Sequence, residues 1–120
     1  MSITIIMKNA HAAALGSFAP KPTSLAGDVH EASRDLWSGV SGGGLQTGIW
    51  EATPGEFGAR RDGFHEICYI IEGRATLRSE CGDSVDVEPG DLFVTPAGWV
   101  GTWAVHEPLR KVFVIAGVNS

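Results

Sequence analysis

Glu66 is the residue whose type and position best fit chemistry in this 120-residue chain. It stands at the head of an apolar run, residues 67–71, which ends at Glu72 and Gly73 and predicts a buried strand that carries a carboxyl group. Burial raises the pKa of a carboxyl group, which then acts as a general acid or base near neutral pH. A nearby Arg60 would instead hold the carboxylate ionised, so an ion pair that only braces the fold is the alternative.

The segments around Glu66 are short strands separated by turns. Residues of the types Gly, Pro and Asp punctuate the chain from residue 45 onward. The predicted strands are 45–51, 57–61, 65–71, 74–78, 84–87, 92–95, 102–105 and 109–118. This many short strands, with no convincing long helix, predict an all-β antiparallel sandwich or barrel.

The first 43 residues have a different texture, with no sustained hydrophobic period and several Gly and Pro residues. We expect an irregular N-terminal arm over residues 1–43, or edge strands, packed on a barrel domain that spans residues 44–120. Within this arm, residues 28–37 fit a short helix. Residues 41–44 are predicted to form a flexible joint.

Composition narrows the class of protein. The net charge of −5, from 14 acidic and 9 basic residues, argues against nucleic acid or an anionic membrane as partner. No apolar run approaches the ~20 residues of a transmembrane helix, and the N-terminal run is too short for a secretory signal. Cys68 and Cys81 form no C-x-x-C pair, and Cys68 is expected in the core. We therefore expect a cytoplasmic protein.

Two spacings resemble the ends of the cupin motifs: Glu66 with Gly73, and Gly90 with Pro96 and Gly98. More narrowly, four stretches resemble small cupins related to ureidoglycine aminohydrolase and to the ethanolamine-utilisation cupin. They are residues 48–55, 66–73, 101–103 and 110–115. The resemblance covers residues 44–116. It implies a cupin-type double-stranded β-helix (jelly-roll barrel) with an interior pocket, and frequently a homodimer.

The chain departs from the metal-binding form of the cupin motif. Aligned on Glu66, the two histidine positions of the first motif fall on Arg60 and Asp62, and the late histidine position falls on Gly101. His65 adjoins Glu66 on a strand, so the two side chains face opposite sides. Since three imidazoles are missing, we expect no cofactor. A divalent metal held by Asp62 and Glu66 is the alternative, although transition metals need several converging donors.

In the barrel that the resemblance implies, strand alternation turns Glu66, Cys68 and Ile70 inward. The same alternation groups Gly101 with Trp103, and the missing side chain at Gly101 is expected to leave space there. The expected pocket combines one acid with an aromatic wall and a charged mouth. Glu66 is its candidate catalytic residue. The predicted ligand-binding residues are Arg60, Asp62, Glu66, Trp103, Trp50 and Phe93.

A concave, largely apolar pocket with few polar groups is typical of a small-molecule site, and Arg60 suits an anionic carboxylate. We predict binding of a small carboxylate or nitrogen-containing metabolite, with metal-independent turnover through Glu66 as its enzymatic form. A non-catalytic sensing or accessory module is one alternative, and a metal-dependent ureidoglycine aminohydrolase-like hydrolase is another. Arg110 and Lys111, flanked by apolar residues, are expected on the solvent face of a strand.

Overall fold

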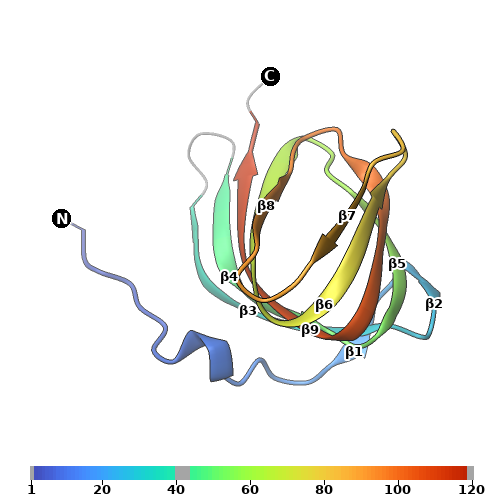
Figure 1. Ribbon diagram of the computed structural model, residues 1–120. Helices are drawn as coiled ribbons and strands as arrows, with labels where there is room; N and C mark the ends of the chain where they lie inside the picture. Colours follow the sequence, from blue (N-terminus) through green and yellow to red (C-terminus); the bar gives the residue numbers. More distant parts are fainter. Residues whose placement is uncertain (1, 40–43, 119–120) are drawn as a thin grey trace.

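A computed structural model describes residues 2–39 and 44–118 of the chain, and it is almost entirely β. A single turn of 3-10 helix, η1 (Ala10–Ala12), precedes the strands. The strands are β1 (Ala19–Pro20), β2 (Ser24–Ala26), β3 (His30–Gly39), β4 (Leu45–Ala52), β5 (Gly55–Arg60), β6 (Phe64–Ser79), β7 (Ser84–Val87), β8 (Leu92–Thr95) and β9 (Val100–Gly117). All their pairings are antiparallel, and together they form the nearly closed barrel of Figure 1, which confirms the all-β prediction.

Two long strands, β6 and β9, run through both halves of the barrel. The C-terminal part of β9 pairs with β4 and with the first half of β6, and its N-terminal part pairs with β5 and with the second half of β6. Register shifts bend β6 near Gly73, whose φ is +84°. A Cβ atom there would also overlap the Pro108 carbonyl group, so only glycine fits this bend. This bend lets the two halves of β6, the first of which contains Glu66, pair with different parts of β9.

The N-terminal region supplies strands to both edges of the barrel. β1 pairs with β3, and β2 pairs with β5. The helix predicted over residues 28–37 is wrong, because β3 forms an antiparallel ladder with β4 from Glu31–Ala52 to Gly39–Leu45, with one register shift between Asp35 and Trp37. Pairing with a neighbouring strand overrides local propensity here. Residues 41–43 of the predicted joint lie outside the described residues, and the division at residue 44 stays a prediction.

The core lies inside the barrel and is dominated by aromatic rings. Phe57 stacks on Trp103 with 5.7 Å between ring centroids, and Trp50 meets Trp103 edge-on at 6.2 Å. On β6, Cys68 and Ile70 are fully buried while Ile67 and Tyr69 are partly exposed, as the alternation predicts. Along the described residues, no helix has the length and apolarity required to span a bilayer.

Candidate functional site

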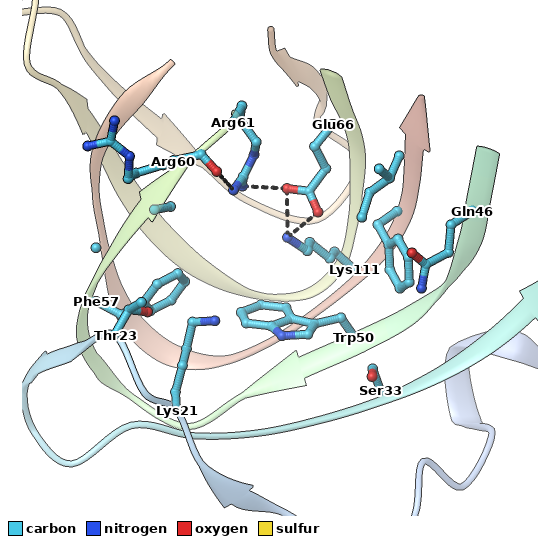
Figure 2. A pocket seen from close by; sticks show the side chains of 14 residues that line it. Lys21, Thr23, Ser33, Gln46, Trp50, Phe57, Arg60, Arg61, Glu66 and Lys111 are labelled. Atoms are coloured by element: carbon cyan, nitrogen blue, oxygen red, sulfur yellow. Dashed lines mark hydrogen bonds and ion pairs between the residues drawn. The ribbon is translucent and has the colours of Figure 1, made fainter. Parts of the chain in front are cut away.

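A cavity of about 360 Å³ opens beside Glu66 in the barrel interior (Figure 2). Its walls come from β3, β4, β5, β6 and β9, together with Lys21 and Thr23 from the segment between β1 and β2. The charged and aromatic side chains that line it are Lys21, Arg60, Arg61, Glu66, Lys111, Trp50, Phe57 and Phe113. This volume is of the size that proteins use to enclose small metabolites.

Glu66 forms ion pairs with two cations, Arg61 and Lys111 (Figure 2). Arg61 Nη2 donates to Glu66 Oε1 at 2.6 Å, and Lys111 Nζ donates to Oε1 at 3.2 Å and to Oε2 at 3.3 Å. Burial by itself would raise the pKa of Glu66, but the charges of Lys111 and Arg61 outweigh burial and lower this pKa below its ordinary value. Glu66 is therefore a carboxylate at neutral pH.

Arg61 is held in place from both its backbone and its side chain. Its amide N–H donates to the Trp99 carbonyl oxygen at 2.9 Å, and its own carbonyl accepts from the Gly98 amide at 2.8 Å. Its Nε donates to Thr95 Oγ1 at 3.0 Å. The turn after β8 thus fixes the guanidinium group in front of Glu66. The neighbouring Arg60 was the expected partner of Glu66, and that prediction is wrong because Arg61 takes this position.

The expectation that Arg110 and Lys111 form a solvent face is also wrong. Lys111 is only 4% exposed, and its Nζ lies 4.4 Å from the ring centroid of Trp50 and 4.3 Å from that of Trp103. Arg110 points the other way, where its Nε donates to Glu51 Oε1 at 3.0 Å and its Nη1 donates to the Ala13 carbonyl oxygen. The N-terminal arm covers this outer face, so both faces of the strand are buried.

A pattern in the sequence marks Lys111 as inward-facing. Residues at every second position of β9 share one face of the strand, and Leu109, Phe113 and Ile115 belong to the same alternating set as Lys111. A lysine on an otherwise apolar face needs a buried counter-charge. Glu66 supplies it from a diagonal position on the neighbouring strand. The lysine on an apolar face and this counter-charge were the missing signal.

Arg60 and Asp62 lie at the rim, away from Glu66. Their side chains are 66% and 70% exposed, and Arg60 Nε donates to Asp62 Oδ2 at 3.2 Å. Arg60 belongs to the cavity lining, whereas its guanidinium group points out of the pocket in Figure 2. The structure therefore does not bring Asp62 and Glu66 together. The roles of Arg60 and Asp62 in ligand binding stay predictions.

The predicted aromatic wall is present, but its members lie at different depths. Trp50 lines the cavity, and its Nε1 donates to Glu31 Oε1 at 2.9 Å. Trp103 lies behind this wall with no exposed surface, and its Nε1 has no acceptor among the described residues. Phe93 is partly buried against Trp103, at 5.7 Å between centroids. Of the three, only Trp50 is in direct reach of a ligand in the cavity.

The space expected at Gly101 does not exist. A Cβ atom built there would overlap the Arg78 carbonyl oxygen and lie 2.7 Å from the Trp99 ring and 2.9 Å from the Ser79 Cα atom. The backbone of β6 approaches too closely for any side chain. A histidine at position 101 would therefore need the strands to move apart.

The metal that the cupin motif implies does not fit the side chains of this site. Among the described residues, no three His, Cys, Asp or Glu side chains converge as a metal-binding group. Two cations already cover the Glu66 carboxylate, and Asp62 pairs with Arg60. His65 Nδ1 accepts from the Ala97 amide at 2.8 Å and so serves the turn after β8. The expectation of a site without a cofactor stays a prediction.

Cys68 lies two residues beyond Glu66 on the same inward face of β6. Burial first, and then the neighbouring Glu66 carboxylate, raise the pKa of the Cys68 thiol to about 12. The thiol is therefore neutral at physiological pH. This agrees with Cys68 as a core residue rather than a nucleophile.

A jelly-roll barrel with a pocket in its interior is the fold of the cupins, as the resemblance implied. The EutQ-like cupin domain model matches residues 41–113, and the chain belongs to this family. No curated protein is similar enough to count as a match.

Solved structures agree with this assignment. A DUF861-family protein of unknown function from Pseudomonas syringae pv. tomato is 27% identical, with a TM-score of 0.74 over 88% of this chain and 46% of its own. The chain thus spans about half the length of that protein. A DUF861-family protein from Thermotoga maritima is 38% identical over 54% of this chain and 73% of its own, with a TM-score of 0.52. A putative ethanolamine-utilisation protein Q from Salmonella typhimurium is 19% identical over 98% of this chain and 96% of its own, with a TM-score of 0.66, and supports the fold alone.

Proposed function

We propose that the barrel pocket binds a small organic anion, with its carboxylate held by Lys111 and Arg61. The observation that carries this proposal is the charge balance of the buried cluster. Two cations, Arg61 and Lys111, surround one carboxylate, Glu66, so the wall of the cavity has an excess positive charge. The whole chain has a net charge of −5, which makes this local excess the more distinctive.

Both cations keep donors for a ligand. An ammonium group has three N–H donors and a guanidinium group has five. Within the residues that the structure describes, Lys111 Nζ donates only to the two oxygens of Glu66, and Arg61 donates to Thr95, Glu66 and the Arg60 carbonyl oxygen. The remaining N–H groups suit a carboxylate, because charge-assisted hydrogen bonds are about twice as strong as neutral ones.

The rest of the pocket favours a ligand with a short apolar or nitrogen-containing body. Trp50 and Phe57 form its aromatic wall, and Lys21 Nζ lies 4.7 Å from the Phe57 ring centroid. Lys21 is in turn held by Glu31, to which it donates at 2.9 Å. Such a wall excludes water from one side of the ligand and strengthens the charge interactions on the other side.

Glu66 has two roles in this proposal. As a carboxylate it keeps Lys111 and Arg61 in position, which a ligand-sensing or accessory protein needs as much as an enzyme does. In the enzymatic form, Glu66 accepts a proton from the bound ligand, as a base weakened by its two cations. The hydrolase alternative resembling ureidoglycine aminohydrolase needs a set of metal donors that the described residues do not bring together.

Titration with matched pairs of ligands tests this proposal. Acetate, glyoxylate, pyruvate and malonate are compared with the corresponding uncharged amides by NMR and by calorimetry. We expect the carboxylates to bind in preference to the amides, and Lys111→Gln to weaken carboxylate binding by about 10- to 100-fold. Equal binding of carboxylates and amides would refute the proposal. One-dimensional NMR of the same samples over time separates a binder, which returns its ligand unchanged, from an enzyme.

A further inference from the structure

We infer that Lys111 is the resident cation of this barrel: its ammonium group stands in front of Glu66, where the metal-binding form of the motif implies a divalent ion. Lys111 thereby excludes a metal from the pocket and presents a positive charge to the ligand. The part of this inference that concerns the ligand rests on the proposed function. The exclusion of metal does not, and it can be tested without any ligand.

The distances support this inference. Lys111 Nζ lies 3.2 and 3.3 Å from the two oxygens of Glu66, so the ammonium group bridges both of them. A zinc ion bound to the same carboxylate would lie about 2.0–2.2 Å from its oxygens, on the side that Lys111 Nζ now occupies. Arg61 Nη2 closes Oε1 from a second direction at 2.6 Å. A divalent ion that approached Glu66 would meet two positive charges in a buried site.

The surroundings of Lys111 stabilise the charged group and prevent it from swinging away. The faces of aromatic rings attract a cation, and Trp50 and Trp103 both lie within 4.4 Å of Nζ. A lysine that left this position would lose the carboxylate and both indole rings together. It would also have to leave a site in which it is only 4% exposed. These contacts together hold the Lys111 ammonium group in the wall of the pocket.

The remaining positions of the motif cannot restore a metal site by themselves. Arg60 and Asp62 pair with each other at the exposed rim, and the β6 backbone blocks any side chain at Gly101. Position 111 is different, because its side chain extends along the inner face of the sheet to Glu66, and Cys68 lies on that same face of β6. An imidazole at position 111 would join an oxygen and a sulfur donor, a combination that suits zinc.

Metal uptake by untagged variants tests the inference. Four proteins are equilibrated with zinc and desalted. They are the wild type, Lys111→His, the double variant Lys111→His with Glu66→Gln, and the matched control Lys8→His. Zinc is then counted by mass spectrometry and related to the melting temperature. We expect stoichiometric zinc and a raised melting temperature for Lys111→His alone, since a bound ion stabilises the native state by mass action. Lys8 is exposed and far from Glu66 in the sequence, so its variant controls for an added imidazole.

Two results would overturn the inference. One is stoichiometric zinc in the wild type that is lost in Glu66→Gln, and the other is a folded Lys111→His protein with no more zinc than the wild type. Should Lys111→His fail to fold, the wild type and Glu66→Gln decide the question by themselves. Zinc exclusion without any carboxylate binding would refute the proposed function and leave Lys111 as the resident cation. Carboxylate binding with stoichiometric zinc at Glu66 would refute the inference about Lys111 and leave the proposed function in place.

Discussion

Residues 60–66 contribute to two groups of charges that differ in their exposure to solvent. Arg60 and Asp62 form a pair at the rim, with side chains 66% and 70% exposed. Arg61 and Glu66 have side chains that are 11% and 9% exposed, and Lys111 completes their cluster from β9. Water screens the first group, whereas the second interacts through the protein interior. Neighbouring residues thus divide between a surface pair and a candidate binding site.

The largest difference should appear when one partner of each group is removed. We expect Glu66→Ala to lower the free energy of unfolding by about 3–5 kcal/mol, because it leaves two buried cations without their counter-charge. Asp62→Ala should lower it by no more than about 1 kcal/mol, because its pair is exposed. Urea unfolding of the two variants measures both values. Equal losses would mean that the buried cluster is far more hydrated than the structure shows.

Ligand binding should follow the same division. We expect Arg61→Gln to weaken carboxylate binding by about 10-fold or more, because it removes a charged donor that lies inside the pocket. Arg60→Gln should change the affinity by only about 2-fold, since the Arg60 guanidinium group points into solvent. Calorimetric titration compares the two. A larger loss of affinity in Arg60→Gln than in Arg61→Gln would indicate that the ligand binds at the rim and not in the pocket.

Acid pH should weaken the fold through the buried group. Since Lys111 and Arg61 lower the pKa of Glu66 in the folded protein, Glu66 stabilises the fold above its ordinary value of 4.5. This contribution is lost as the pH falls below that value and through the lowered pKa. We expect Glu66→Gln to flatten the fall in the free energy of unfolding between about pH 6 and about pH 3. A slope that Glu66→Gln leaves unchanged would contradict the buried ion-pair cluster of Glu66, Arg61 and Lys111.

The two thiols offer a smaller test of the same contrast. Cys81 is exposed, whereas Cys68 has no exposed surface and a pKa raised to about 12. We expect one thiol per native chain to react with a disulfide reagent at mildly alkaline pH. Cys81→Ser should abolish that reaction, and Cys68→Ser should leave it unchanged. Rapid reaction of Cys68 in the folded protein would show that the barrel core around it opens to solvent.

Much of the fold could be predicted from local patterns. Turn residues separate most of the strands, and alternation along β6 places Glu66, Cys68 and Ile70 inward. Two predicted breaks are wrong, because 65–71 and 74–78 form the single strand β6, and 102–105 and 109–118 form the single strand β9. The strand β3 escaped prediction because its ladder with β4, rather than its own propensity, decides its conformation. The crowding at Gly101 could not be foreseen either, since it comes from the Arg78 carbonyl group on the neighbouring strand.

The site was predicted only in part. Glu66 and Trp50 could be assigned to the pocket from the sequence. The spacing of Glu66 to Gly73 indicates the first, and the expected aromatic wall includes the second. The choice of Arg61 over Arg60 depends on hydrogen bonds to Trp99 and Gly98, which the turn after β8 provides. Lys111 lies 45 residues from Glu66 in the sequence, and only the pairing of β6 with β9 brings their charges together.

The central claim is that Lys111 and Arg61 bind a carboxylate inside the barrel. A crystal structure with the tightest-binding carboxylate of the titration series tests it most directly. We expect a ligand oxygen about 3 Å from Lys111 Nζ and from the Arg61 guanidinium group, with the body of the ligand against Trp50. A ligand bound outside the pocket, or a metal ion joining the ligand to Glu66, would contradict it.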